Sequence, residues 1–348
     1  MPSIRSNHAQ AFRAGRPKVL LMDPIQLAKS VETRLGDKYE LLKFESRNRD
    51  EFVKDCQKGE KYEGVRAIYR HFKGASTKVT GQFDPKLVEK LPETLEFICH
   101  NGAGYDQIDI PSCTSRRIQV SNVPVAVDDA TADTALFLLL GSLRQFGPAQ
   151  RSLYSGHFNS QLPLSNDPKG KLLGIVGMGG IGRAFAKRAK SLGMTVQYHN
   201  RNRLSEDQED GAKYVETLGE LLESSDVVSL NLPLNEKTKG LIGKKEFERM
   251  KETAVLINTA RGGVVKEQEL VEALEKGEIV GCGLDVYEDE PRINEGLIKS
   301  DKAFLLPHVG TLTVETQTEM EAVCLRNIEQ GLETGKLGFT VPEQKGEF

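Results

Sequence analysis

The sequence predicts an α/β protein with two domains, each built around a parallel β-sheet. Short apolar runs alternate with amphipathic segments along almost the whole chain, as strands alternate with helices in a parallel sheet. A glycine-rich turn stands near the middle of the sequence, between an apolar run and a segment with helical periodicity. The length of 348 residues is more than one small core needs and suits two domains of ordinary size.

Composition and charge exclude several classes of protein. Hydrophobic residues make up 38% and charged residues 28% of the chain, which is typical of a globular protein in water. The net charge of −3 gives no general attraction to nucleic acid or to an anionic membrane, so neither is expected as a partner. The five cysteines are scattered and indicate reduced thiols in a cytoplasmic protein. The six histidines show no ligand spacing, and no metal site is expected.

The N-terminus is basic, since Arg5, Arg13, Arg16 and Lys18 all precede the first acidic residue, Asp23. We interpret it as a disordered tail, and mitochondrial targeting is the alternative that stays open. A secretory signal is not expected, because no apolar core segment of the usual kind is present.

The first part of the chain predicts a parallel sheet without a glycine fingerprint. Strands are expected at 19–22, 40–44, 65–69, 95–99 and 118–121, and helices at 26–34, 49–56 and 85–90. The loop Asn101-Gly-Ala-Gly104 follows one of these strands, where ligands commonly meet open α/β sheets. A purely structural turn explains this loop equally well when it is taken alone.

The segment ATADTALFLLLGSLRQF, residues 130–146, predicts a long apolar helix. Asp128 and Asp129 precede it and suit a helix N-terminus. So apolar a helix must be covered almost all round, either by its own domain or by a second subunit. Residues 155–170 contain proline and glycine and are expected to form a surface loop.

Residues 171–182 carry a dinucleotide-binding fingerprint. The apolar run 171–176 leads into Gly177-Met-Gly-Gly-Ile-Gly182, and residues 181–192 follow with helical spacing. The first glycine allows the tight turn, the second lets a pyrophosphate approach the backbone, and the third lets the helix pack on the strand. Free N–H groups at the helix N-terminus would hold the phosphates.

The rest of this domain predicts six strands in all, as in a Rossmann-like sheet. The further strands are expected at 195–199, 227–232, 254–258, 279–284 and 304–306. Helices are expected at 217–223, 245–250 and 268–276, and a final helix at 313–332. The tail beyond that helix is polar and without pattern.

The residues after the second strand of this domain favour NADPH. An NAD-selective site has an acid about 20 residues beyond the glycines, which holds the ribose hydroxyls. Here Asn200 stands in that place, and Arg201 and Arg203 follow it. Guanidinium groups suit a 2′-phosphate, which a carboxylate would repel. A solvated basic loop is the alternative; we expect NADPH, with NADH used more weakly.

Three later motifs have side chains suited to catalysis: NTARGG (258–263), GLDVYEDEP (283–291) and LPHVG (306–310). An arginine at the end of a strand can bind a carboxylate through two hydrogen bonds. Taken singly, the acidic loop and the histidine each have an ordinary structural explanation.

Taken together and in this order, the motifs resemble those of the D-isomer-specific 2-hydroxyacid dehydrogenase family. The resemblance extends from about residue 18 to about residue 340 and also includes GAGYDQID. More narrowly, HNGAGYDQID, ATADTALFLLLG, YHNR and PHVGTLTVET resemble the fungal glyoxylate and hydroxypyruvate reductases. The resemblance implies a Rossmann-like and a flavodoxin-like domain, with the active site in the cleft between them.

The resemblance assigns the catalytic roles to Arg261, Glu290 and His308. His308 would protonate the developing alkoxide of a 2-keto acid, Glu290 would orient the imidazole, and Arg261 would bind the carboxylate. The backbone of Gly102, Ala103 and Gly104 would also bind the substrate carboxylate. The implied cofactor site consists of Gly177, Met178, Gly179, Gly180, Ile181, Gly182, Asn200, Arg201, Arg203, Leu232, Pro233, Thr259, Ala260, Asp285, His308 and Gly310. His71 and His100 have no partner that the sequence identifies and are interpreted as structural.

We predict that residues 1–124 and 308–348 form the substrate domain and that 125–307 form the NADPH-binding domain. The predicted function is NADPH-dependent reduction of glyoxylate or hydroxypyruvate to a D-2-hydroxy acid, in a homodimer formed through the helix at 130–146. A D-mandelate-type or broad-specificity 2-keto-acid reductase is the alternative within the same chemistry. A nucleotide-sensing corepressor or scaffold is the alternative from a different class.

Overall fold

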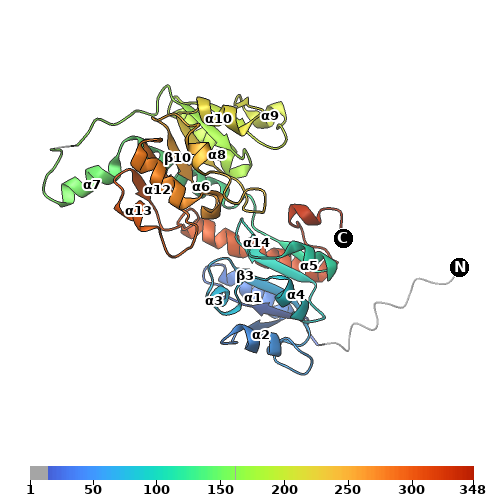
Figure 1. Ribbon diagram of the computed structural model, residues 1–348. Helices are drawn as coiled ribbons and strands as arrows, with labels where there is room; N and C mark the ends of the chain where they lie inside the picture. Colours follow the sequence, from blue (N-terminus) through green and yellow to red (C-terminus); the bar gives the residue numbers. More distant parts are fainter. Residues whose placement is uncertain (1–14, 161) are drawn as a thin grey trace. The chain divides into compact units, whose positions relative to one another are not determined.

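The computed structural model describes residues 15–160 and 162–348, and its ribbon is drawn in Figure 1. The chain forms two compact units: unit 1 ends at Val123 and resumes at Val314–Phe348, and unit 2 is Pro124–Thr313. Residues 308–313 therefore lie in unit 2, although the sequence analysis assigned them to the substrate domain. They are held there because the Asp285 carboxylate accepts hydrogen bonds from the backbone of Val309 and Gly310. Arg5 and Arg13, on which the targeting hypothesis depends, lie outside the described residues.

Unit 1 contains a five-stranded parallel sheet in the order β2-β1-β3-β4-β5. Its strands are β1 (Lys18–Leu21), β2 (Glu40–Lys43), β3 (Val65–His71), β4 (Phe97–Asn101) and β5 (Gln119–Ser121). Its helices are α1 (Lys29–Lys38), α2 (Arg49–Asp55), α3 (Ala75–Thr80), α4 (Pro85–Lys90), α5 (Ile110–Ser115) and α14 (Val314–Thr334). The central strands β3 and β4 are almost entirely buried, which suits the apolar residues that each of them contains.

Helix α1 begins at Lys29, three residues later than its apolar spacing predicts. The reason is a carboxylate from α14: Glu321 is buried and accepts hydrogen bonds from the N–H groups of Gln26, Leu27 and Ala28, at 2.8–2.9 Å. These residues directly precede α1, so the carboxylate of Glu321 satisfies their N–H groups, and α1 has no side-chain cap of its own. The contact joins residues almost 300 positions apart, so local periodicity could not reveal it.

Unit 2 contains a seven-stranded parallel sheet in the order β12-β11-β10-β9-β6-β7-β8. Its strands are β6 (Leu172–Val176), β7 (Thr195–His199), β8 (Lys213–Tyr214), β9 (Val227–Leu230), β10 (Val255–Asn258), β11 (Gly281–Leu284) and β12 (Ala303–Leu305). Six of the seven are predicted from the sequence. The additional strand, β8, has only two residues and pairs with the edge of β7, too short a run to show a period.

The helices of unit 2 are α6 (Asp128–Leu143), α7 (Phe146–Tyr154), α8 (Gly180–Ser191), α9 (Glu206–Glu209), α10 (Leu218–Ser224), α11 (Lys244–Phe247), α12 (Glu267–Lys276) and α13 (Glu295–Lys299). The helix predicted at 130–146 ends at Leu143, because Gln145 adopts a left-handed backbone and α7 starts after it. A Cβ on Gly141 would lie 2.1 Å from the ring of Phe304, so the absence of a side chain there lets β12 pack against α6. Among the described residues, no helix combines the length and the apolarity needed to cross a membrane.

The C-terminal tail is ordered, whereas the sequence analysis found no pattern in it. Val341 is buried, and its N–H group donates to the carbonyl of Val120 at 2.9 Å. Gln344, in the 3₁₀ turn Pro342–Gln344, accepts from the N–H of Val120 at 2.7 Å and donates to the carbonyl of Ile118 at 2.9 Å. The tail thus packs beside β5 through backbone groups and one amide, which leave no hydrophobic period in the sequence.

Candidate active site

Each of the three glycines of the fingerprint stands at its position for a different structural reason. Gly177 follows β6 with φ of +100°, and a Cβ there would lie 2.6 Å from the carbonyl oxygen of Asn231. A Cβ on Gly182 would lie 2.5 Å from the carbonyl oxygen of Gly177, so α8 packs closely on the turn. Gly179 caps α8 and has open space on its Cβ side. The N-terminus of α8 is therefore open to a ligand that carries phosphates.

Asn200, which stands where an NAD-selective site has its acid, binds the glycine turn itself. Its Oδ1 accepts a hydrogen bond from the N–H of Met178 at 2.7 Å. Leu232 lies against the same turn, because a Cβ on Gly177 would be 3.0 Å from its Cδ2. The carbonyl of the next residue, Pro233, accepts from the hydroxyl of Thr238. The start of the glycine turn thus contacts the segments that follow β7 and β9.

The two arginines after Asn200 have different surroundings. Arg203 forms a bidentate ion pair with Glu209, with Nε–Oε1 at 2.7 Å and Nη2–Oε2 at 3.1 Å. The Tyr198 hydroxyl also donates to Glu209, and the hydrogen bonds from Arg203 and Tyr198 lower the pKa of the Glu209 carboxyl to about 2. Arg201 is exposed and has no hydrogen bond or ion pair to any residue in the described part of the chain. The positive charge of Arg203 is therefore compensated, and that of Arg201 is not.

The turn that carries Arg261 is closed by Asn258, the buried last residue of β10. Its Oδ1 accepts from the N–H of Ala260 and its Nδ2 donates to the carbonyl of Arg261, both at 3.0 Å. Arg261 Nη1 donates to the carbonyl of Ala260 at 2.8 Å. Asn258 belongs to the NTARGG motif, in which only Arg261 is predicted to be catalytic; an asparagine at a strand end directly before a turn is the signal that could reveal its role.

Buried polar atoms without partners lie at the carboxyl ends of β9 and β10. Thr259 Oγ1 and Asn231 Oδ1 make no hydrogen bond to any described residue. Buried polar groups are nearly always hydrogen-bonded in folded proteins, so these two atoms fit a site that is completed by a polar ligand. A dinucleotide that starts at the glycine turn has such polar groups along its length.

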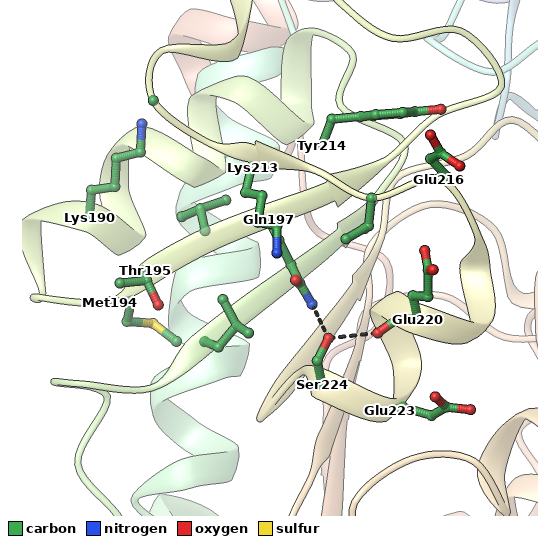
Figure 2. A pocket seen from close by; sticks show the side chains of 14 residues that line it. Lys190, Met194, Thr195, Gln197, Lys213, Tyr214, Glu216, Glu220, Glu223 and Ser224 are labelled. Carbon is green, nitrogen blue, oxygen red and sulfur yellow. Dashed lines mark hydrogen bonds between the residues drawn. The ribbon is translucent and has the colours of Figure 1, made fainter.

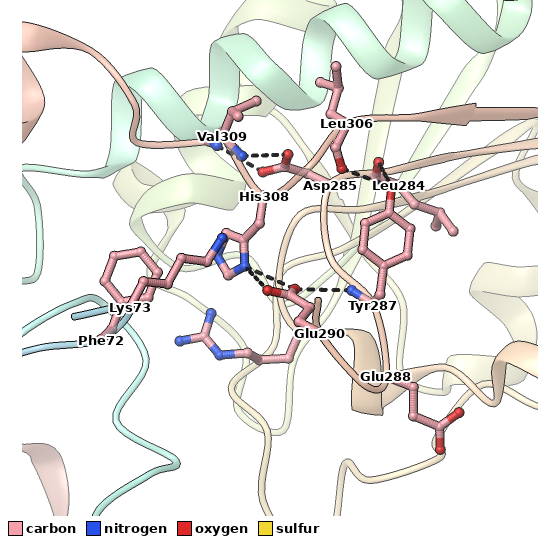
Figure 3. Close-up of polar contacts among 12 residues, drawn as sticks. Phe72, Lys73, Leu284, Asp285, Tyr287, Glu288, Glu290, Leu306, His308 and Val309 are labelled. Atoms are coloured by element: carbon pink, nitrogen blue, oxygen red, sulfur yellow. Dashed lines mark hydrogen bonds and ion pairs between the residues drawn. The ribbon is translucent and has the colours of Figure 1, made fainter. Parts of the chain in front are cut away.

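His308 and Glu290 form a hydrogen-bonded pair (Figure 3). Nδ1 of His308 lies 2.8 Å from Oε2 and 2.9 Å from Oε1 of Glu290, and Oε1 also accepts from the N–H of Tyr287 at 3.1 Å. The side chains of His308 and Glu290 are 18% and 28% exposed. Because an ionised carboxylate only accepts hydrogen bonds, Nδ1 carries a proton, and Nε2 is the nitrogen that can exchange one with a ligand.

The backbone around His308 is held from the segment that carries Glu290. Asp285 is buried and accepts from the N–H groups of Val309 and Gly310 at 2.7 and 2.8 Å. The Tyr287 hydroxyl donates to the carbonyl of Leu306 at 2.8 Å. His308 itself has φ of +55°, which is uncommon outside glycine, so its conformation depends on these contacts. Both carboxylate oxygens of Asp285 thus position the histidine loop, and its place facing the cofactor stays a prediction.

The turn with Arg261 lies beside the same segment. A Cβ on Gly262 would be 1.8 Å from the carbonyl carbon of Tyr287, so only glycine permits this approach. Since Tyr287 donates its N–H to Glu290, the structure brings the three predicted catalytic residues onto adjoining backbone segments of unit 2. Tyr287 is a positioning residue that the sequence analysis did not single out, although it is the one aromatic residue within GLDVYEDEP.

In unit 1, residues 102–104 form a loop with all three carbonyl groups hydrogen-bonded. The carbonyl of Gly102 accepts from the Val123 N–H at 2.9 Å, and that of Ala103 accepts from Asn122 Nδ2 at 2.6 Å. The carbonyl of Gly104 lies 2.9 Å from Nε2 of His100. In a trans peptide the N–H points away from its own carbonyl, so each of these three contacts also fixes the direction of the N–H group of the next residue. Such successive N–H groups form a concave anion site.

A hollow of about 1040 Å³ in unit 2 lies elsewhere (Figure 2). Its lining includes Leu172 and Thr195, the first residues of β6 and β7, whereas the glycine turn follows the last residue of β6. At its wall Gln197 donates to Ser224 at 2.7 Å. This hollow therefore includes the end of β6 opposite to the one that leads into the glycine turn. No cluster of metal-ligating side chains occurs among residues 15–160 and 162–348.

Comparison with known proteins decides the family. A sequence model described as the NAD binding domain of D-isomer specific 2-hydroxyacid dehydrogenases matches residues 136–310. The 4-methyl-2-oxopentanoate reductase A of Aspergillus oryzae is 49% identical over 332 residues, which cover 95% of this chain and 100% of that protein. The chain belongs to the D-isomer-specific 2-hydroxyacid dehydrogenase family.

Solved structures agree with this assignment. The crystal structure of a glyoxylate reductase from Paecilomyes thermophila matches the dehydrogenase with a TM-score of 0.92 and 46% identity, covering 95% of this chain and 100% of that one. An NADPH-dependent glyoxylate/hydroxypyruvate reductase from Sinorhizobium meliloti, in complex with NADP and malonate, matches with a TM-score of 0.82 and 30% identity over 94% of this chain and 98% of that one. The predicted resemblance, the two parallel-sheet α/β domains and the nicotinamide-dependent dehydrogenase activity are confirmed.

Proposed function

We propose that this dehydrogenase reduces small 2-keto acids, glyoxylate or hydroxypyruvate, to D-2-hydroxy acids with NADPH. The observation that carries the proposal is the His308–Glu290 pair, in which the carboxylate binds Nδ1 and fixes the orientation of the imidazole. Two of the similar solved structures are described as glyoxylate or glyoxylate/hydroxypyruvate reductases, which supports the choice of substrate.

The protein's own residues supply the proton and the charge. When bound, the nicotinamide supplies the hydride that reduces C2 of the keto acid. His308 donates its Nε2 proton to the keto oxygen as that oxygen gains negative charge. Glu290 keeps the imidazole in one orientation and stabilises its positive form. The guanidinium of Arg261 binds the substrate carboxylate and stabilises the developing charge.

The preference for NADPH rests on Arg201 more than on Arg203. Glu209 already binds Nε and Nη2 of Arg203, so this guanidinium has fewer donors and less net charge to offer a 2′-phosphate. Arg201 is exposed and lies next to Asn200, and it forms no ion pair with any acidic residue of the described chain. The absence of an acid at residue 200 removes the repulsion that would exclude the phosphate.

Arg201→Ala is expected to raise the KM for NADPH roughly 10-fold, the value of one charge-assisted hydrogen bond, and to leave the KM for NADH unchanged. Steady-state kinetics with both cofactors on glyoxylate check this. Arg203→Ala is the matched control and is expected to have a smaller effect on NADPH. Equal catalytic efficiency of the unmutated enzyme with the two cofactors would contradict the proposed preference.

The size of the substrate separates the main proposal from its alternative. The Aspergillus oryzae relative is named for a branched six-carbon keto acid, which favours a broader 2-keto-acid reductase as the second candidate. We expect the highest kcat/KM with glyoxylate or hydroxypyruvate in a series that also contains 4-methyl-2-oxopentanoate and phenylglyoxylate. A preference for either larger acid would establish the broad-specificity or D-mandelate-type alternative instead. Failure to turn over any of the four acids would favour a nucleotide-sensing scaffold.

We propose that a second copy of the chain covers α6 and α7. These helices expose Phe137, Phe146, Leu153 and Tyr154, an unusual concentration of apolar surface for two neighbouring helices. A symmetric dimer would bury such a surface.

The five cysteines are all buried and free, which supports the expected cytoplasmic location, and fractionation of cells would test it.

The double variant Leu153→Asp/Tyr154→Asp is expected to shift the protein from dimer to monomer of 38.5 kDa in sedimentation equilibrium, because two charges would lie in an apolar interface. Ile298→Asp, on the exposed face of α13, is the control and should leave the mass unchanged. An unmutated protein that sediments as a monomer would rule out the proposed interface.

A further inference from the structure

Two ionisable side chains are buried beneath the loop of residues 102–104. Arg70 in β3 is 1% exposed and His100 in β4 is 0% exposed, and the two residues are register partners in the parallel sheet. Arg70 Nη1 lies 3.1 Å from Nδ1 of His100, and His100 Nε2 lies 2.9 Å from the carbonyl oxygen of Gly104. The sequence alone identifies no partner for His100 and favours a structural role, whereas the structure places it in a chain of polar contacts that ends at the loop.

The two contacts of His100 determine its protonation state. A guanidinium only donates hydrogen bonds, so Nδ1 of His100 accepts from Arg70 and carries no proton. A carbonyl oxygen only accepts, so Nε2 carries the proton that is donated to Gly104. His100 is therefore a neutral imidazole in a single tautomer, and Arg70 selects that tautomer.

Arg70 is held in the core and remains protonated at neutral pH, so it continues to donate to Nδ1 of His100. Its guanidinium lies over the ring of Phe83, 5.1 Å from the ring centroid, within the core of unit 1. Burial lowers the pKa of Arg70 only to about 10, so it stays a cation, and a donor, at neutral pH. A charged residue is rarely placed in a core without a partner or a role, since its desolvation is costly.

The loop depends on these contacts because two of its three residues are glycines, which restrict the backbone little. A Cβ on Gly102 would lie 2.9 Å from Nε2 of His100, so the loop lies directly on the imidazole. The hydrogen bond from His100 orients the peptide between Gly104 and Tyr105, whereas Asn122 and Val123 orient the two peptides before it. Together they fix the orientation of three successive peptides of the loop.

We propose that His100 and Arg70 are positioning residues for the substrate carboxylate: Arg70 fixes the tautomer of His100, and His100 holds the loop whose N–H groups bind the carboxylate. This inference rests on the proposed function, in which the loop binds a 2-keto acid. His100 and Arg70 would therefore contribute to substrate affinity. Their replacement should change the KM for the keto acid and not the rate of hydride or proton transfer.

His100→Asn and His100→Gln form a matched pair for the test. The amide of glutamine can reach the position of Nε2 and donate to Gly104, whereas that of asparagine is too short. His100→Asn is expected to raise the KM for glyoxylate roughly 5- to 10-fold, the loss of one buried hydrogen bond, with kcat within about twofold and the KM for NADPH unchanged. His100→Gln is expected to restore the KM for glyoxylate to within about threefold of the unmutated enzyme.

Arg70→Met tests the selection of the tautomer and removes the buried charge while keeping most of the side-chain volume. In the enzyme that retains His100, we expect Arg70→Met to raise the KM for glyoxylate roughly 3- to 5-fold. In the His100→Asn variant we expect no further rise, because Arg70 acts through His100. Additive effects would overturn the role of Arg70.

An unchanged KM for glyoxylate in His100→Asn, or equal KM increases for glyoxylate and NADPH with a lowered Tm, would show that His100 is only structural. Turnover of the unmutated enzyme separates this failure from that of the proposed function. An enzyme that reduces no 2-keto acid contradicts the proposed function, whereas an enzyme that reduces glyoxylate with the same KM in all His100 variants contradicts only this inference.

Discussion

Replacement of His308 by glutamine is expected to lower kcat for glyoxylate reduction by about 10²- to 10⁴-fold, the usual contribution of a general acid. Glutamine retains much of the size and polarity of histidine but cannot release a proton near neutral pH. The KM for NADPH should change by less than about threefold, because the glycine turn is anchored by Asn200 and the contacts of Gly182, not by His308. Loss of NADPH absorbance in steady state measures both quantities.

His157→Gln is the matched control, since His157 is exposed and lies in the segment after α7. It should leave kcat unchanged. Glu290→Gln should lower kcat less than His308→Gln, because the amide can still contact Nδ1 but no longer stabilises the imidazolium. Retention of more than a tenth of kcat in His308→Gln would show that another group supplies the proton.

Replacement of Arg261 by alanine is expected to lower kcat/KM for glyoxylate by about 10²- to 10³-fold. The reason is the loss of a guanidinium that binds the substrate carboxylate and stabilises the developing oxyanion. The closed turn should survive, because Asn258 binds the backbone of residues 260 and 261 and not the Arg261 side chain. Kinetics on glyoxylate and a thermal unfolding curve together separate the catalytic loss from a loss of stability.

Arg292→Ala is the matched control for this prediction. Arg292 is exposed and forms an ion pair only with its near neighbour Asp289 among the described residues, so its removal should change kcat/KM by less than about twofold. Arg261→Lys should recover little activity, because an ammonium cannot make the paired hydrogen bonds of a guanidinium. Full activity in Arg261→Lys would mean that only a positive charge is needed there.

Most of the fold follows from the alternation of short apolar runs with amphipathic segments. The central strands, buried on both faces, need continuous apolar residues, and this requirement is local and visible in the sequence. The features that the sequence analysis missed depend on distant partners. Helix α1 starts late because Glu321 binds the turn before it, and the C-terminal tail is ordered because Gln344 binds the backbone beside β5. The two-residue strand β8 is likewise stabilised only by its neighbour β7.

The candidate site divides in the same way. Arg261, Glu290 and His308 could be named from their motifs, because each motif holds a chemically suitable side chain in a set order. The mutual orientation of these three side chains cannot be deduced from the motifs. It depends on contacts that the motifs do not reveal: Asp285 binds the backbone of the histidine loop, and Tyr287 binds the carbonyl of Leu306.

The sequence by itself determined the fold class, the place of the glycine turn and the residue types available for chemistry, since these depend on spacing within short segments. Only the tertiary structure decided which of those residues have a partner. It showed that Glu209 compensates Arg203 and leaves Arg201 uncompensated. It also showed that His100, which has no identifiable partner in the sequence, contacts Arg70 and the carbonyl of Gly104. The physical reason is that hydrogen bonds and ion pairs act over about 3 Å in space, whatever the separation along the chain.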